Sequence, residues 1–424
     1  MKVKIIDISQ TQKEIEITLF PEEIRNYLEK ASEIISFEKN IKGFRPGKAP
    51  KEVIEQNFGK EIIWKKASLL ASEDYFLKIV KEHQFNLVST PKIEIPSIEV
   101  EKSVFYRVFI EILPEVILPD YKKIAKEVRK EKKEVKIEEG EIEKTLKFLQ
   151  ESRALLKAVN RGAKEGDEVV INFEAKINDM PQKGTKIEKL RIVLGKERIM
   201  KGFDKQLINL KRGESKVFSL ERGSNGTQKN KITFSVKILE IFERKIPELT
   251  DEFARSLGSF SNLDDLKEKL KRNLKIEKEG KERERIRRKI IEAIAKETQV
   301  EAPPSLVKKE LNNMIDELKI SLSQNGVSFE EYLEKSKNTE EKLKKEWQGE
   351  AERRIIFHLI LQEIGKKEKI EIPEKEVTER ANYYLNRYHV PPSQLPDPKE
   401  LKLYIRNLLI NERVFQLLEG ESIS

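Results

Sequence analysis

The first 112 residues combine two patterns of apolar positions. Residues 2–19 alternate apolar and polar side chains, which predicts two strands, with apolar positions at Val3, Ile5, Ile15, Ile17 and Leu19. Pro21 stands where proline is favoured, at the first position of a helix. One apolar helical face follows it, made of Ile24, Tyr27, Leu28, Ala31, Ile34 and Ile35. We expect a short helix from Pro50 closed by Gly59, a longer helix over 61–83 and two strands at 92–95 and 103–113. This pattern predicts a compact α+β domain.

The rest of the chain changes character twice. Residues 120–149 are dense in charge and lead into a helix expected over 139–156. A strand-rich segment begins at 166–173 and ends at 231–241, with glycine-containing turns between its strands. After Pro247 the apolar spacing is almost wholly helical, and helices are predicted over 262–299, 306–323, 340–367, 373–389 and 398–419. The fold class is therefore a multi-domain α+β protein with an extended all-α C-terminal part.

Composition excludes several kinds of chemistry. The 424 residues include no cysteine, which excludes disulfides, thiol catalysis and thiolate metal sites. The three histidines, His83, His358 and His389, lie far apart in sequence, and His358 falls in an apolar helical run where we expect a core residue. We therefore expect no metal and no cofactor.

The same composition argues against membrane insertion. No stretch of about 18 apolar residues occurs, so no membrane span is expected. The N-terminus has Asp7 inside its apolar run and no small-residue cleavage site, unlike a signal peptide. A soluble cytoplasmic protein is expected.

Charge is unevenly distributed along the chain. The formal net charge is +9, and residues 150–245 alone hold 22 basic and 13 acidic side chains. One hypothesis is that this segment makes an electrostatic contact with RNA or with acidic stretches of other polypeptides. The alternative is a set of solvated lysines with no partner.

A basic loop separates two of the predicted helices. Cations stand at every third position, namely Lys39, Lys42, Arg45, Lys48 and Lys51, with no acid between them. Gly43 and Gly47 permit backbone angles that other residues resist, and Pro46 and Pro50 fix theirs. The stretch reads either as a shaped, apolar-tipped loop that contacts RNA phosphates beside a protein groove, or as a solvated turn with incidental lysines.

The loop also carries a family resemblance. The segment Gly43-Phe44-Arg45-Pro46-Gly47-Lys48-Ala49-Pro50 resembles the G-F-R-x-G-K-x-P ribosome-docking signature of the trigger factor family, and every fixed position is present. The resemblance extends over nearly the whole chain. It implies that the ribosome-binding residues are Gly43, Phe44, Arg45, Pro46, Gly47, Lys48 and Pro50. The implied partners are protein and RNA at the rim of the ribosomal exit tunnel.

Residues 150–245 resemble an FKBP-type prolyl isomerase. The resemblance rests on Gly166-Asp167, Phe173, Leu194-Gly195, the run from Arg198 to Phe203, and Phe234. It implies an antiparallel sheet that wraps a helix and an apolar proline pocket lined by Phe173, Leu190, Ile199, Met200, Phe203 and Phe234. Such a pocket lowers the barrier of a partly double-bonded imide without a nucleophile or metal.

Two departures from the isomerase pattern predict weak or lost activity. The usual Phe-Pro-x-x-Tyr segment is missing, and a polar, basic loop over 220–231 stands in its place. The aromatic–acid pair after the first strand is also absent, because residues 177–184 contain no aromatic. The alternative interpretation is that the six apolar residues are ordinary core around a degenerate pocket.

Taken together, the resemblance implies four parts. They are a ribosome-binding domain (1–112), a connector that packs with the helical part (113–149), an inserted isomerase-like domain (150–245) and a helical, substrate-cradling domain (246–424). The implied protein is an ATP-independent, ribosome-associated chaperone that binds nascent and unfolded polypeptides, with a weak homodimer off the ribosome. We find no Walker A sequence. Apolar stripes in the helical part serve either clients or the core, and one consists of Ile355, Ile356, Leu359, Ile360 and Ile364.

Two other functions stay open at this point. The first is a stand-alone prolyl isomerase whose helical arms recruit clients without the ribosome. The second is an RNA-binding assembly factor that uses the basic loop and the basic middle segment.

Overall fold

The structure is a computed structural model that describes every residue except 40, 96–97, 178–179, 225–226, 389–396 and 422–424. His389 and Pro391-Pro392 therefore lie outside the described residues, as do two positions of the segment 177–184. The chain divides into two compact units, one formed by Met1–Lys132 and Arg283–Ser424, the other by Lys133–Glu282.

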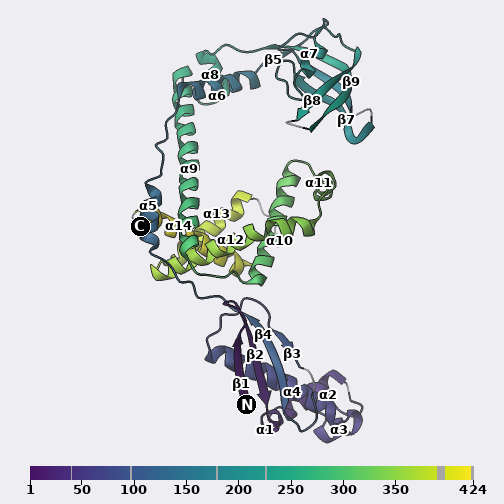
Figure 1. The fold of residues 1–424 in the computed structure, drawn as a ribbon, viewed down its shortest axis with the longest axis vertical. Helices are drawn as coiled ribbons and strands as arrows, with labels where there is room; N and C mark the ends of the chain where they lie inside the picture. The colour runs from purple at the N-terminus through teal and green to yellow at the C-terminus, as the bar shows by residue number, and fades with distance from the viewer. Residues whose placement is uncertain (40, 96–97, 178–179, 225–226, 389–396, 422–424) are drawn as a thin grey trace. The chain divides into compact units, whose positions relative to one another are not determined.

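The N-terminal part of the first unit is an antiparallel sheet covered by helices (Figure 1). Its strands, in the order β1-β2-β4-β3, are β1 (Lys2–Asp7), β2 (Gln12–Leu19), β4 (Val104–Glu111) and β3 (Lys92–Glu94). Its helices are α1 (Pro21–Arg25), α2 (Leu28–Lys39), α3 (Lys51–Phe58) and α4 (Lys60–Glu82). The alternation of β2 buries Ile15, Ile17 and Leu19, which pack in one core with Trp64 and Phe76 of α4. This arrangement matches the predicted α+β domain.

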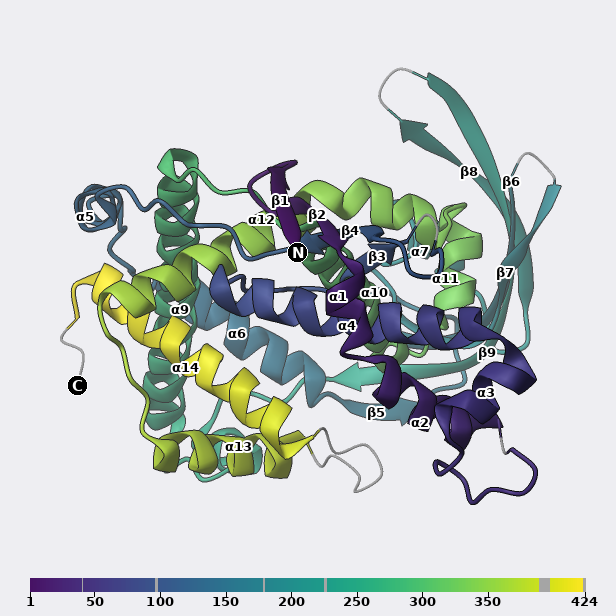
Figure 2. The same cartoon turned by 90° about the horizontal axis from the view of Figure 1, so that it is seen from below.

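The C-terminal part of the first unit is helical, as Figure 2 also shows. Its elements are α10 (Pro304–Gln324), α11 (Phe329–Ser336), α12 (Glu340–Lys367), α13 (Glu374–Tyr388) and α14 (Pro398–Glu419), together with the end of α9 (Leu263–Glu297). The connector helix α5 (Tyr121–Arg129) packs here, with Tyr121 and Ala125 buried against Ile290 of α9 and Ile360 of α12.

The second unit is built around an antiparallel sheet. Its strands are β5 (Leu155–Ala158), β6 (Glu168–Ile177), β7 (Met180–Val193), β8 (Ser215–Ser224) and β9 (Thr227–Lys245). They follow the order β5-β9-β6-β7, with β8 paired to β9. The short α7 (Phe203–Leu207) packs on the sheet, while α6 (Glu139–Ser152), α8 (Asp251–Leu257) and the start of α9 share a small core of Leu146, Ala254 and Leu266. The predicted fold class is confirmed.

Several predicted boundaries were wrong. The helix expected over 139–156 ends at Ser152, because the chain then extends and Leu155 pairs with Lys245 in the sheet. Helices α5, α8 and α11 were not predicted, although the hydroxyl of Ser328 caps α11 by accepting a bond from Glu331 N–H.

His358 is exposed on α12, so the expectation of a core histidine was wrong.

No helix in the described part of the chain is both long and apolar enough to cross a membrane.

Candidate functional site

The basic loop joins α2 to α3 and is fastened at both ends. Ile41 and Ala49 are each only 8% exposed and belong to the N-terminal core. The backbone N–H of Ala49 donates to the buried hydroxyl of Ser36 at 3.0 Å. Gly43 and Gly47 adopt φ of +89° and +79°, angles that side chains other than glycine resist. The loop therefore has a defined backbone held by the domain.

Between these anchors the loop displays its side chains to solvent. Phe44 is 40% exposed, and Arg45, Pro46 and Lys48 are also exposed around a turn in which Lys48 N–H donates to Arg45 C=O at 2.9 Å. Lys51 pairs with Glu55, whereas no carboxylate among the described residues pairs with Lys42, Arg45 or Lys48. The tip can therefore present three free cations and one ring to an anionic, grooved surface.

A second exposed ring beside the loop was missed by sequence reasoning. Phe37, near the end of α2, is 71% exposed. The sequence did contain an indication of this exposure. Phe37 lies two residues after Ile35 and therefore off the apolar face of the helix, where its ring cannot be buried in the core.

The six residues of the expected proline pocket gather in one cluster. Phe203 and Phe234 are buried, and the other four are partly buried against the same core, namely Phe173, Leu190, Ile199 and Met200. The ring of Phe203 lies 6.0 Å from that of Phe173 and 5.1 Å from that of Phe234, both edge-on. Such pairs stabilise beyond their buried area, so the rings hold one another in place.

A buried carboxylate positions the segment that carries Ile199 and Met200. Asp204 is 2% exposed and accepts hydrogen bonds from Gly195 N–H at 2.9 Å and Glu197 N–H at 2.8 Å. Gly195 adopts φ of +96°, an angle that side chains other than glycine resist. The carboxylate thus ties the loop to the first residues of α7.

Phe218 on β8 is a further aromatic in this cluster that the sequence did not reveal. Its ring lies 5.3 Å from Phe203 and 5.6 Å from Phe234. It lies two residues before the segment 220–231 noted as a departure, and its apolar alternation with Leu220 was the available signal. The side chains of residues 177–185 and 222–230, where both departures fall, lie outside those the structure describes.

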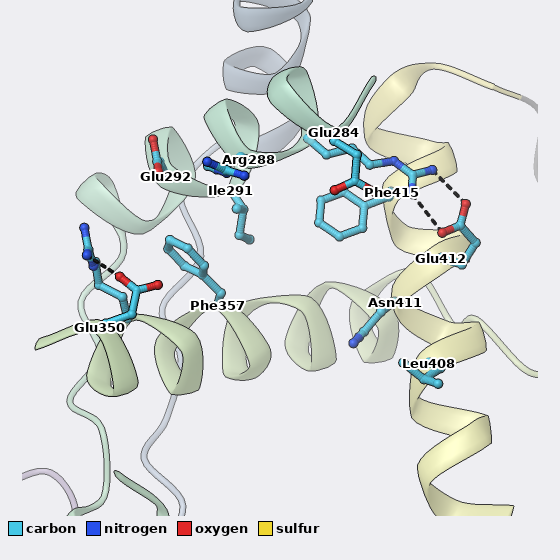
Figure 3. Close-up of a pocket in the computed structure, with 12 residues that line it drawn as sticks. Glu284, Arg288, Ile291, Glu292, Glu350, Phe357, Leu408, Asn411, Glu412 and Phe415 are labelled. Atoms are coloured by element: carbon cyan, nitrogen blue, oxygen red, sulfur yellow. Dashed lines mark hydrogen bonds and ion pairs between the residues drawn. The ribbon is translucent and has the colours of Figure 1, made fainter. Parts of the chain in front are cut away.

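The helical part contains an open groove between α9, α12 and α14 (Figure 3). It has a volume of about 690 Å³ and an apolar floor that includes Ile291, Phe357 and Phe415. Leu408 of α14 stands at its side and is 44% exposed. The rim carries charges of both signs, so the groove can take a segment with an apolar side chain between polar ones.

Ion pairs join two of the helices that border this groove. Arg287 of α9 bonds Glu412 at 2.7 Å and Glu419 at 2.9 Å, and Arg283 bonds Glu419 at 2.7 Å. Burial of Arg287 disfavours its charge, but the two carboxylates outweigh it and raise its pKa. The hydrogen bonds from Arg287 lower the pKa of Glu412.

The stripe of Ile355, Ile356, Leu359, Ile360 and Ile364 belongs to the core. Leu359, Ile360 and Ile364 are buried, and the other two are partly buried against neighbouring helices. Large apolar residues that are exposed in this part lie elsewhere, at Ile320, Tyr383, Leu403, Tyr404 and Leu408.

Family models match three stretches of the chain. Residues 1–149 match a family described as bacterial trigger factor protein, and residues 262–419 match the C-terminus of the same protein. Residues 159–239 match the family of FKBP-type peptidyl-prolyl cis-trans isomerases.

Individual relatives match along their whole length. The trigger factor of Clostridium botulinum (strain Hall) is 30% identical over all of this chain and 99% of its own. That of Halothermothrix orenii is 30% identical over 96% of this chain and 94% of its own. That of Clostridium kluyveri is 29% identical over 100% and 99%.

A solved structure shares the fold. The structure titled "Promiscuous Substrate Recognition in Folding and Assembly Activities of the Trigger Factor Chaperone" aligns with a TM-score of 0.52 and 24% identity. The alignment covers 99% of this chain and 100% of that one.

Proposed function

Because the chain belongs to the trigger factor family, we propose that its loop of residues 41–50 docks it on the ribosome while its helical part holds unfolded chains. The chain is a ribosome-associated molecular chaperone with an FKBP-type peptidyl-prolyl isomerase domain.

One observation carries the docking proposal, namely the fixed and exposed tip of the loop. Arg45 and Lys48 have no carboxylate partner among the described residues, so they need not break an existing ion pair to reach a phosphate. Phe44 can fill an apolar hollow between such phosphates. The buried anchors at Ile41 and Ala49 reduce the entropy lost on docking, because the backbone is already ordered. The expected surface is protein and RNA at the exit-tunnel rim.

Co-sedimentation with bacterial ribosomes tests this proposal. The variant Phe44→Ala/Arg45→Ala/Lys48→Ala should lose binding at least tenfold while still suppressing aggregation of an unfolded client. A matched variant of exposed residues in the same domain, Phe105→Ala/Arg25→Ala/Lys30→Ala, should bind like wild type. Unchanged binding of the loop variant would reduce the loop to a turn, and a stand-alone isomerase or an RNA-binding assembly factor would then fit better.

The aromatic cluster of the second unit is our proposed proline pocket. Rotation about the prolyl bond is slow because its partial double bond gives a barrier of about 20 kcal/mol. An apolar surface disfavours the charge-separated form of the imide and so lowers that barrier. Phe173, Leu190, Ile199 and Met200 are partly exposed on the cluster and would contact proline, while Phe203 and Phe234 would support them from below. The missing pocket tyrosine predicts slow catalysis.

We propose that separate apolar patches on the helical part bind unfolded client chains. The groove between α9, α12 and α14 supplies one, with Leu408 exposed at its side. Ile320 on α10 and Leu403 on α14 supply others, at 61% and 60% exposure. Small apolar patches surrounded by charged residues can bind many different sequences weakly, as a holding chaperone requires.

We retain the division into 1–112, 113–149, 150–245 and 246–424 as a proposal. Gln150 donates its side-chain N–H to the carbonyl of Pro247 at 2.8 Å, so the chain enters and leaves the isomerase-like domain at neighbouring points. The cores that join α5 to α9 and α6 to α8 support a connector that packs with helical elements.

Location and self-association follow from the same proposal. A protein that docks on bacterial ribosomes works in the cytoplasm, and we place this chain there. A weak homodimer off the ribosome would cover exposed apolar residues of the N-terminal domain such as Phe37 and Leu77.

A further inference from the structure

The second unit contains a cavity that none of the proposed pocket residues line. It lies between the end of α6 and the sheet, and its volume is about 490 Å³. Its apolar part consists of Ile192, Val193 and Phe148. Phe148 projects from α6 and is 69% exposed, with no ring or cation stacked on it among the described residues. The exposed ring at the edge of the cavity offers a face on which a planar group can stack.

Four cations converge on this cavity. They are Arg191, Lys196, Arg198 and Arg244, against two acids, Glu151 and Glu168. Arg191 pairs with Glu168 at 3.1 Å, and Lys196 pairs with Glu151 at 2.8 Å. Both acids are thus already neutralised by two of the cations.

The other two cations have bonding capacity left. Arg198 is exposed and pairs with no carboxylate in the described part of the chain. Arg244 donates one Nη to the carbonyl of Glu151 at 2.5 Å, while its Nε is buried with no hydrogen-bond partner among the described residues. No carboxylate in the described part of the chain pairs with Arg244, so its guanidinium, which lines the cavity, keeps a positive charge available to an anion there.

We propose that this cavity binds single-stranded RNA, with a base stacked on Phe148 and backbone phosphates at Arg198 and Arg244. Three of the four cations are arginines, whose planar forks match phosphate oxygens in pairs. An exposed aromatic beside them fits an unstacked base, which a duplex would not offer. The surplus of nine positive charges in residues 150–245 attracts a polyanion more strongly than a client with scattered acids.

The proposal does not depend on ribosome docking through the loop of residues 41–50. A chain that failed to dock there would still bind isolated RNA through this cavity, and the reverse holds as well. The two sites can therefore be tested separately.

The test is fluorescence anisotropy of the full chain with a labelled uridine oligomer of about 12 nucleotides, within the usual length of a single-strand site. Phe148→Ala should raise the dissociation constant at least about fivefold, because base stacking on an aromatic is worth that much or more. Arg198→Gln should raise it about threefold to tenfold. It should also reduce the slope of log affinity against log salt by about 0.7, the value for one lost phosphate contact on a single strand.

Two exposed residues of the same domain serve as matched controls. Val217→Ala removes an equally exposed apolar side chain on β8, at 67% exposure, and Lys237→Gln removes an exposed cation on β9. Neither lines the cavity, so both should bind RNA like wild type.

Three results would overturn the proposal. One is the absence of RNA binding at low salt, and another is equal weakening by Lys237→Gln and Arg198→Gln, which would mean diffuse attraction without a site. The third is a combination of two findings. Polyglutamate at equal charge concentration displaces the RNA, and Phe148→Ala binds RNA with the same affinity as wild type. That result would assign the cavity to acidic polypeptide.

Discussion

Phe173 and Phe203 touch each other, yet they differ in exposure and therefore in role. Phe203 is fully buried and its ring contacts those of Phe173, Phe218 and Phe234, whereas Phe173 is partly exposed at the edge of the cluster. A residue at the edge can contact a ligand, and a residue at the centre can only support those that do. This difference separates a pocket from ordinary core.

Phe173→Leu should lower kcat/KM for a proline tetrapeptide roughly tenfold with little change in thermal stability, because leucine keeps most of the apolar volume but removes the ring. Phe203→Ala should instead destabilise the domain by about 3–5 kcal/mol, the usual cost of removing a buried phenylalanine. A protease-coupled isomerisation assay and thermal melting measure the two effects.

The control for this pair is Val217→Ala, which lies on β8 beside Phe218 but is 67% exposed. It should change neither quantity. If Phe173→Leu also left kcat/KM unchanged, the cluster would be core and the pocket assignment would fail.

Among the elements, α9 and α14 are joined by charge as well as by apolar contact. Glu419 has a side-chain exposure of 10%, and its burial alone would raise its pKa, but Arg287 and Arg283 reverse the sign and lower it. The pKa of Glu412 is also lowered, mainly by its bond from Arg287. A carboxylate with a lowered pKa stabilises the folded state above its unfolded pKa of about 4.3, and that stability is lost as the pH falls through the folded pKa.

We therefore expect the melting midpoint of the helical part to fall more steeply between pH 6 and pH 3 in wild type than in Glu419→Gln. Glutamine cannot titrate, so the variant starts lower at pH 6 and loses less on acidification. Circular dichroism at 222 nm measures this. A matched change at an exposed acid of the same helix that pairs with no cation among the described residues, Glu400→Gln, should behave like wild type. Parallel pH curves for wild type and Glu419→Gln would contradict the assignment.

The sequence predicted element boundaries correctly where neighbouring residues, such as helix caps, set the boundary. Helices α12 and α14 begin and end where the apolar spacing and caps place them, with Thr339 and Asp397 accepting bonds from their first turns. The helix α6 ended early because Leu155 and Leu156 pair with β9, a strand about 90 residues away. Local propensity contains no information about such a distant partner.

At the scale of the whole molecule, the isomerase-like domain behaves as an insertion. Its ends meet at the bond between Gln150 and Pro247 and in the pairing of β5 with β9. The helices on either side, α6 and α8, share a core with α9 that contains no residue of the sheet. The flanking elements therefore do not need the inserted domain for their packing.

Replacing residues 151–246 by a short Gly-Ser linker should leave a folded, helical protein that still co-sediments with ribosomes. Prolyl isomerase activity and RNA binding at the cavity should both disappear with the domain. Circular dichroism, co-sedimentation and the tetrapeptide assay measure these three properties. Aggregation or loss of helical signal would show that the segment is part of a larger core, and the proposed domain boundaries would be wrong.

The sequence alone determined those features of the structure that depend on residues close together in the chain. The spacing of apolar positions determined the fold class and most helices. The glycines and prolines from Gly43 to Pro50 determined the shape of the exposed basic loop, because those residues set backbone angles locally. Tertiary structure decided which apolar residues are core and which are surface. The stripe from Ile355 to Ile364 became core, and Phe218 joined the aromatic cluster. Tertiary structure also gathered Phe148, Arg198 and Arg244 around one cavity. Those outcomes depend on contacts between residues distant in the chain, which no local pattern specifies.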